Sequence, residues 1–257
     1  MEREKSFDLD TPHPRSSLRP SSPDKTYDIV IEPHRVFKVL LLTICALSAT
    51  GIFWAYVVFG LGYNRLQNLA GLFLLDNGQN IPTLFSFALL IMCSLFLAAI
   101  SIQECLLRAE WRYHWVFLSA VIFLMSFDEA ASVHERFVPL IWNGLDASGW
   151  LFDAWVISGG AFVVLVTLAY LRFVMALPQP FSMLFAVSAV LYTVGALGFD
   201  MIGGAYAAEN GMETFAYHFI ATVEETLEMI GLAVFSFALL LFLTCQKAAV
   251  RFRIRAG

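Results

Sequence analysis

The sequence predicts an all-α, polytopic membrane protein built as a bundle of about six transmembrane helices. Hydrophobic residues make up 59% of its 257 residues and charged residues only 14%, and its mean hydropathy is +0.71. This apolar share exceeds that of soluble domains. Runs such as Val39–Val58 and Leu232–Leu243 are continuously apolar, whereas the strands of a membrane barrel alternate apolar and polar residues.

Six stretches reach the length of about 20 apolar residues that a membrane-spanning helix needs. They lie, in order, at 37–60, 83–105, 114–135, 153–174, 181–203 and 214–245. Pro82 suits the first turn of the second span, where the backbone N–H has no helical partner. Pro178 and Pro180 suit a tight turn between the fourth and fifth spans.

The spans form one domain, residues 36–246, between two tails. Residues 1–35 are polar and rich in Ser, Pro and charge, and they lack the early apolar core of a signal peptide. This composition predicts a disordered N-terminal tail. Residues 247–257 form a short basic C-terminal tail.

Basic residues predict the orientation of the spans. Fourteen of the sixteen Lys and Arg residues fall on one side of a six-span arrangement, in the two tails and in the loops after spans two and four. Only Arg65 and Arg136 fall on the other side. Because positively charged loops stay inside, both termini are expected in the cytoplasm.

Acidic residues lie in or at the ends of three spans, where an ionised carboxylate in hydrocarbon is costly. The segments are Ser126–Glu135 with Asp128, Glu129, His134 and Glu135; Gly198–Asp200; and His218–Glu228 with Glu224 and Glu225. In the predicted orientation all three segments reach the outer half of the membrane. We therefore expect one carboxylate/histidine site that opens to the outside, with Asp76 and Asn80 as a candidate lid.

The charges of this cluster are unbalanced in the sequence. Glu224, Glu225 and Glu228 lie within five residues, so their carboxylates repel one another. On a helix, Asp128, Ser132 and Glu135 would share one face. Arg136 is the only basic residue near the cluster along the sequence. Either metal ions supply the missing positive charge or several carboxyls share protons.

Under the metal hypothesis, the candidate catalytic residues are Asp128 and Glu129. The candidate metal ligands are His134, Glu135, Asp200, His218, Glu224, Glu225 and Glu228. Mixed carboxylate and imidazole ligands suit Fe, Mn or Zn, so the expected cofactor is a divalent metal ion. The structural alternative is hydrogen bonding between neutral acids on neighbouring helices.

Known metal and hydrolase motifs match only in part. His134-Glu135 is followed by Val138 where a zinc protease needs its second His, and the chain has no GxSxG nucleophile elbow. Its inventory of carboxylates and two His is similar to that of di-metal helix bundles, but their Glu-x-x-His spacing is absent.

Four motifs carry a family resemblance. They are Asp76 with Asn80-Ile-Pro82, Ser126-x-Asp-Glu129 with His134-Glu135, Gly198-Phe-Asp200-Met, and Glu224-Glu-Thr-Leu-Glu-Met229. Together they resemble an uncharacterised family of bacterial six-span membrane proteins, in which Glu stands at the position of Asp200. The resemblance implies a bacterial inner (plasma) membrane protein and brings no established activity.

The leading functional hypothesis is an integral membrane metalloprotein, an oxidoreductase or hydrolase acting on a lipophilic or periplasmic small molecule. Alternatives are a proton- or cation-coupled transporter and a non-catalytic sensor or assembly subunit. The sequence has no clear internal repeat and no paired Gly/Pro interruptions in matching spans, which disfavours a transporter. The lipid bilayer is the expected environment, and no nucleic-acid-binding motif is present.

Overall fold

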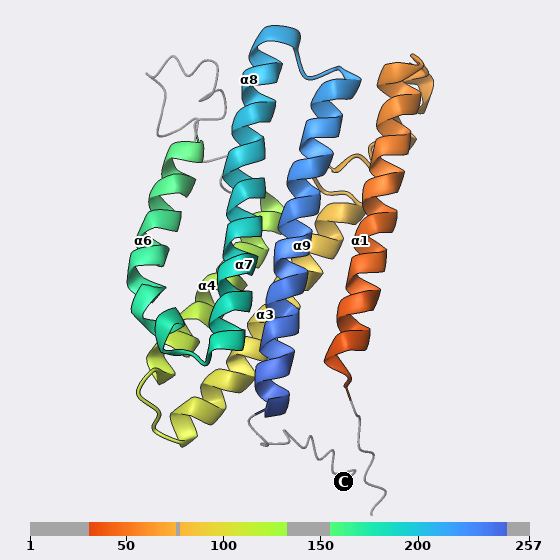
Figure 1. Cartoon of the computed structure of the whole chain (residues 1–257). Coiled ribbons are helices and arrows are strands. Elements are labelled where there is room, and N and C mark those ends of the chain that lie inside the picture. Colours follow the sequence, from red (N-terminus) through yellow and green to blue (C-terminus); the bar gives the residue numbers. More distant parts are fainter. Residues whose placement is uncertain (1–30, 76–77, 133–154, 246–257) are drawn as a thin grey trace, which may run out of the picture. The chain divides into compact units, whose positions relative to one another are not determined.

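The computed structural model describes residues 31–75, 78–132 and 155–245, and these residues are helical without any strand. The elements, coloured along the chain in Figure 1, are α1 Pro33–Ala55, the π-helical η1 Tyr56–Gly60, the 3-10 helix η2 Asn64–Leu66, α2 Gln67–Ala70, α3 Ile81–Leu106, α4 Arg112–Ala131, α6 Trp155–Ala176, α7 Gln179–Thr193, the π-helical η5 Val194–Phe199, α8 Asp200–Asn210 and α9 Phe215–Cys245.

The predicted six-span architecture is confirmed. Six helical segments are long and apolar enough to cross a membrane: Pro33–Gly60, Ile81–Leu106, Arg112–Ala131, Val156–Ala176, Gln179–Asn210 and Phe215–Cys245. Pro82 lies in the first turn of α3, as expected. The fifth segment runs seven residues beyond its predicted end at 203 (210 − 203) and stops at Gly211, whose φ of 79° breaks the helix.

The third span ends earlier than predicted. Ser132 adopts a left-handed conformation with φ 44° and caps the C-terminus of α4. The prediction that Asp128 and Ser132 share one helical face with Glu135 is therefore wrong for Ser132, because that residue has left the helix. Glu135 lies outside the described residues.

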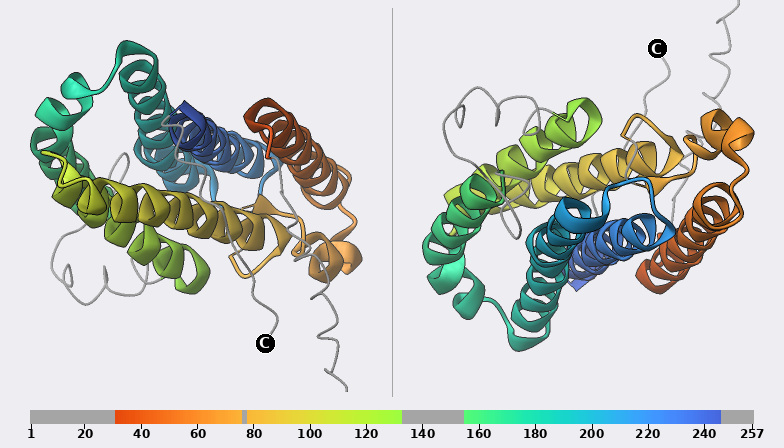
Figure 2. Two further views of the ribbon diagram at one scale, coloured as in Figure 1. Left: turned by 90° about the horizontal axis from the view of Figure 1, so that it is seen from below. Right: turned by 90° about the horizontal axis from the view of Figure 1, so that it is seen from above.

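Helix α9 is the central element of the bundle. It packs against α1, α3, α7, η5 and α8, and Figure 2 shows it between α1 and α7 from both ends. Of the six candidate spans it is the most buried: 61% of its most apolar 18-residue stretch lies inside the bundle. Helix α9 therefore holds α1, α3, α7 and α8 in place relative to one another.

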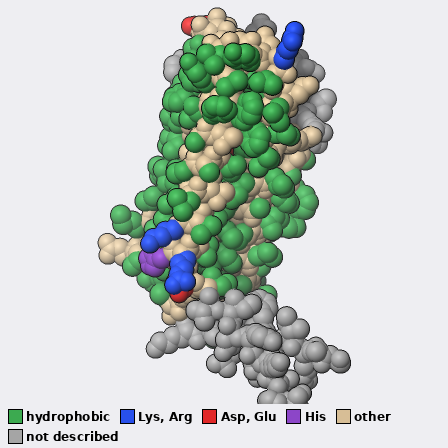
Figure 3. Space-filling model, turned by 90° about the vertical axis from the view of Figure 1, so that its right-hand side faces the viewer, with side chains coloured by type: hydrophobic (Ala, Val, Ile, Leu, Met, Phe, Trp, Pro, Cys, Tyr) green, Lys and Arg blue, Asp and Glu red, His purple; other side chains and the backbone are tan. Residues whose placement is uncertain are grey.

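Three apolar clusters fill the space between the helices. One joins Trp115, Phe173 and Leu239, a second joins Ile44, Leu89 and Met229, and a third joins Ala55, Val58 and Leu74. The outer surface is also apolar, with Leu42, Leu95 and Leu168 each more than 60% exposed. Figure 3 shows hydrophobic side chains over most of one face, with charged side chains near its two ends. Such a surface suits a lipid environment.

Helices α7 and α9 approach each other closely at Gly231. A Cβ at this position would lie 2.9 Å from the backbone N of Tyr192 and 3.0 Å from the carbonyl O of Ser188. The Ser188 hydroxyl also donates a 2.8 Å hydrogen bond to the carbonyl O of Gly231. Small residues allow this kind of backbone contact between membrane helices, where packing and hydrogen bonds replace the hydrophobic driving force.

We predict that Gly231→Ala lowers the free energy of unfolding by about 1–3 kcal/mol, because the new methyl group meets backbone atoms that cannot rotate away. The matched control is Gly160→Ala in α6, where an added Cβ meets nothing within 4 Å. The control should be neutral or slightly stabilising. Thermal unfolding of the detergent-purified variants measures both, and equal stability of the two variants would contradict the close approach.

Candidate functional site

The candidate site is centred on Glu228 of α9 and Tyr192 of α7, which are joined by a side-chain hydrogen bond. The tyrosine hydroxyl donates and the carboxyl group accepts. The carboxyls of Glu129 on α4 and Asp200 on α8 are close enough to act electrostatically on Glu228, and those of Glu129 and Glu225 act on Tyr192. Carboxyl groups from three spans therefore interact with the Glu228–Tyr192 pair.

Two glycines bring these side chains together. At Gly195, in η5, an added Cβ would lie 2.8 Å from the carbonyl O of Glu224 and 2.9 Å from Cγ of Glu228. Gly231 makes the corresponding contact with Tyr192 itself. Because neither glycine has a side chain, α7 and η5 lie directly on the acidic segment of α9, and Tyr192 reaches Glu228.

The π-helical turn η5 sets the direction of Asp200. This segment, Val194–Phe199, interrupts an otherwise continuous α-helical span and ends one residue before Asp200. A π turn inserts an extra residue and rotates all that follows, and such turns are frequent at functional sites. Without that rotation, Asp200 would leave the helix in a different direction relative to α9.

The acidic segment of α9 has a second, structural face. Thr226 forms a 2.6 Å hydrogen bond with Ser48 of α1, and its hydroxyl also bonds the carbonyl O of Thr222. Glu228 is thereby directed toward α7 while Thr226 faces α1. Ser126, a residue of the first acidic motif, is buried, and its hydroxyl donates a 2.6 Å hydrogen bond to the carbonyl O of Phe123 in the same helix, α4.

His218 lies apart from Glu228. The two residues are ten positions apart on one helix, about 15 Å along its axis. The imidazole is buried and stacks on Phe59 of η1 with ring centroids 4.2 Å apart. Its Nδ1 has no hydrogen-bond partner among the described residues. The structure thus places His218 in the first turn of α9, away from the acid cluster.

The remaining predicted site residues divide into three groups. Asp128, Glu129, Asp200, Glu224 and Glu225 take part in polar or electrostatic interactions. Asn80 caps α3, where its Oδ1 accepts from the backbone N–H of Thr83 at 2.8 Å and its Nδ2 donates to carbonyls of the preceding loop. Asp76, His134 and Glu135 lie outside the described residues, so the lid and two of the proposed ligands stay predictions.

No three His, Cys, Asp or Glu side chains are arranged to hold one metal ion within residues 31–75, 78–132 and 155–245. The carboxyls around Glu228 are close enough to interact electrostatically. They do not form a metal-ligand shell by themselves. A metal centre here would need His134, Glu135 or a movement of side chains.

Sequence reasoning missed Tyr192. Its sequence neighbours are apolar or small, and a tyrosine in a membrane span is most simply read as packing or as an interfacial anchor. The available signal was weak: Tyr192 lies three residues before Gly195, and this glycine permits the close helix contact that brings Tyr192 to Glu228.

Comparison with known families gives a match over most of the chain. A family described as a domain of unknown function (DUF8692) matches residues 39–243, which contain all six spans except their outermost turns. The chain belongs to this family. The match confirms the predicted membership of an uncharacterised family. No curated protein and no solved structure matches the chain.

We predict that Tyr192→Phe lowers the free energy of unfolding by about 1–2 kcal/mol, because Glu228 loses its hydrogen-bond donor inside the bundle. The loss should be much smaller in a Glu228→Met background, where no acceptor is present. Tyr63→Phe, at a residue that is 59% exposed, serves as the control with no expected effect. Thermal unfolding of the four variants gives the coupling, and equal losses in both backgrounds would argue against the bond.

Proposed function

We propose that the acid cluster is an exchangeable cation site of a membrane protein. The carboxyls share protons in the arrangement of the described residues, and a divalent metal ion takes the place of those protons when it binds. The supporting observation is the convergence of carboxyls from three spans on the Glu228–Tyr192 pair: Glu129 and Asp200 both act electrostatically on Glu228, which is hydrogen-bonded to Tyr192. A site of this kind is costly to maintain in a membrane, which favours function over packing.

Electrostatics supports the need for a cation. Glu228 is partly buried and faces two other carboxyls. Across the described residues, no Lys, Arg or His side chain forms an ion pair with it. A hydrogen bond from a neutral phenol does not neutralise a carboxylate. In this proposal, a proton shared with a neighbouring acid or a bound metal ion balances the charge of Glu228.

The metal-bound form of this proposal uses more than the described residues. Glu225 and Glu228 would provide oxygen ligands from α9, and Asp200 would provide one from α8. His134 and Glu135 would complete a shell suited to Fe, Mn or Zn, whereas His218 lies too far along α9 from Glu228 to join it. The metal would act there as a Lewis acid or redox centre, with Asp128 and Glu129 as acid–base groups.

The depth of the cluster supports access from the outer side. Thirteen residues of α9 precede Glu228 and seventeen follow it, or about 20 Å and 26 Å of helix. In the predicted orientation the shorter path leads outward. We therefore propose that the protein is an inner-membrane enzyme, a hydrolase or oxidoreductase, whose substrate is lipophilic or periplasmic, in a bacterial cell.

A second candidate function is proton- or cation-coupled transport. The observation that favours it is η5, a π-helical segment with Gly195 and Gly198 inside the fifth span, since transporters place irregular helical backbone at their ion sites. The acids occupy only one half of α9, however, and a transporter needs a polar path through the other half as well.

Metal analysis tests the proposal directly. Detergent-purified wild-type protein, equilibrated with Zn²⁺, Mn²⁺ or Fe²⁺ and dialysed, should retain one of these metals stoichiometrically. Glu228→Gln and Glu225→Gln should weaken the affinity by about 10- to 100-fold, the cost typical of losing a group at a metal site. Glu209→Gln, which removes an exposed acid at the end of α8, is the control and should retain the metal.

The protons that the metal displaces from the carboxyls can be measured with the same preparation. Metal addition in weak buffer should release protons from the wild type, and the affinity should rise with pH because carboxyl and imidazole ligands bind only when deprotonated. Failure of the wild type to bind any of the three metals would overturn the metal half of the proposal and leave proton coupling as the function.

The orientation is tested by reporter fusions. A fluorescent protein fused to the C-terminus should fluoresce, and alkaline phosphatase inserted after Gly211, between α8 and α9, should be active, because that turn is predicted to lie outside. An active phosphatase fused at the C-terminus would contradict an outward-facing acid cluster.

A further inference from the structure

The segment that joins α1 to α3 lies inside the bundle. At Gly51, nine residues before the end of η1 (60 − 51) and about 13 Å from it, an added Cβ would lie 3.2 Å from the carbonyl O of Phe73 and would also meet the Leu75 side chain. Leu75 is 2% exposed and belongs to the same buried apolar cluster as Met229, the residue next to Glu228. Apolar chain therefore reaches the depth of the acid cluster from the end of the bundle where α9 begins.

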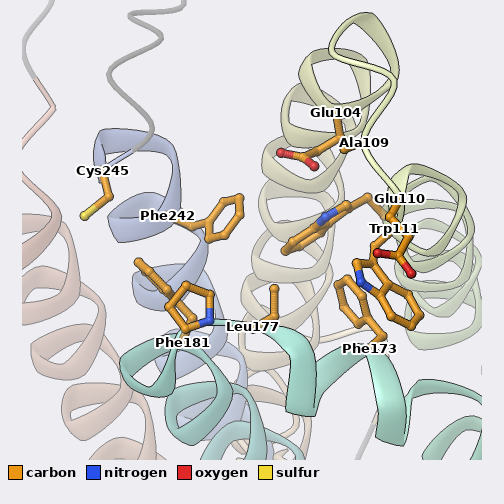
Figure 4. A pocket seen from close by; sticks show the side chains of 11 residues that line it. Glu104, Ala109, Glu110, Trp111, Phe173, Leu177, Phe181, Phe242 and Cys245 are labelled. Atoms are coloured by element: carbon orange, nitrogen blue, oxygen red, sulfur yellow. The ribbon is translucent and has the colours of Figure 1, made fainter.

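A pocket at the opposite end of the bundle does not reach the acid cluster. It has a volume of about 340 Å³, and its lining includes Trp111, Phe173 and Phe242 (Figure 4). Phe242 follows Glu228 on α9 by fourteen residues (242 − 228), about 21 Å of helix. Leu239, which lies between them on α9, is fully buried in an apolar cluster. Apolar packing therefore separates this pocket from the acids.

His218 is a polar side chain within the apolar packing at the start of α9. Its imidazole is 7% exposed, stacks on Phe59 with ring centroids 4.2 Å apart and meets the Tyr217 ring edge to face at 5.4 Å. Within the part of the chain that the structure describes, it forms no ion pair, and its Nδ1 is buried without a hydrogen-bond partner. A buried polar atom without a partner is costly, which favours a functional role for this nitrogen.

Three polar residues of α9 share the face that His218 occupies. His218, Thr222 and Glu225 lie within about 60° of one another around the helix, and Glu225 is seven residues from His218, about 10 Å. Thr222 is buried, and its hydroxyl donates a 2.7 Å hydrogen bond to the carbonyl O of His218. Glu225 acts electrostatically on Tyr192 in the acid cluster. An imidazole, a hydroxyl and a carboxyl group therefore follow one another along α9, from its start to the acid cluster.

We propose that His218 carries protons between the acid cluster and the solvent at the start of α9. This proposal rests on the proton sharing of the proposed function. The O–H bond of the Glu225 carboxyl breaks, a proton passes along the Thr222 hydroxyl, and an N–H bond forms at Nδ1 of His218. The N–H bond at Nε2 then breaks and releases a proton to water. One proton has left the cluster and the imidazole is neutral again, and the reverse sequence returns a proton to the acids.

The chemistry of His218 suits this step. Imidazole is the side chain that gains and loses a proton near neutral pH, and it can accept a proton at one nitrogen while it releases one from the other. The two rings packed against it, those of Phe59 and Tyr217, are uncharged at neutral pH. They fix the position of the imidazole and do not trap a proton on it.

Exchange of carboxyl protons for deuterium tests this proposal. Full-length protein in detergent is mixed with D₂O, and the shift of the carboxylic acid C=O infrared band is followed in time. The part of the band that is lost in Glu225→Gln and Glu228→Gln reports the acid cluster. His218→Ala should slow the exchange of that part by about 100-fold, the lower end of what a positioned proton-transfer group contributes. Added imidazole should restore the rate, because it can occupy the space that the side chain leaves.

Matched variants separate proton transfer from packing. His218→Phe keeps a ring against Phe59 but cannot carry a proton, so it should be as slow as His218→Ala and should not respond to imidazole. Thr222→Val should also slow the exchange, whereas Thr222→Ser, which keeps the hydroxyl, should stay near the wild-type rate. His34→Ala removes an exposed imidazole at the start of α1 and should leave the rate unchanged. Thermal unfolding checks that each variant is folded.

The outcomes distinguish this proposal from the cation site. The exchange needs no metal, so a failure of metal binding leaves the test intact. A wild-type rate in His218→Phe, or slow exchange in His218→Ala that imidazole does not restore, would overturn the role of His218 and leave the proton sharing in place. The absence of any carboxylic acid band that depends on Glu225 or Glu228 would overturn the shared protons and, with them, this proposal.

Discussion

The close approach of α7 and η5 to α9 is the contact on which the rest of the structure depends. Gly231 allows the backbone of α7 to lie against α9, and Gly195 allows η5 to lie directly against Glu224 and Glu228. In a membrane such contacts gain their energy from packing and from hydrogen bonds such as Ser188 to Gly231. A side chain at either position would separate the helices and, with them, Tyr192 and Glu228.

The same contact gathers carboxyl groups where solvation is poorest. Glu129, Asp200 and Glu228 gather near the middle of α9, while Thr226, on the other side of that helix, bonds to α1. The helix thereby separates a structural face from an acidic face. At the other end of the bundle, the acids Glu104 and Glu110 lie beside aromatic rings. Both places combine carboxylates with an apolar surrounding, but only the first gathers them from spans far apart in the sequence.

Particular residues show how far sequence reasoning reaches in this chain. The six spans could be predicted because about 20 successive apolar residues have few other uses, and the acids within them stand out because they contradict that pattern. The end of α4 at Ser132 could not be predicted, since a left-handed serine has no sequence signature. His218 was grouped with the acids by chemistry, but ten residues of rigid helix separate it from Glu228.

The sequence by itself determined the membrane-spanning architecture and the identity of the acidic segments, because hydropathy and charge are properties of each residue. The tertiary structure alone decided which of those acids meet, and it added Tyr192 to them. The reason is geometric: the rotation of Asp200 by the π turn η5 and the contacts at Gly195 and Gly231 arise only when two helices are packed together. Residue type shows that a carboxyl in a span needs a partner, and packing decides which one it has.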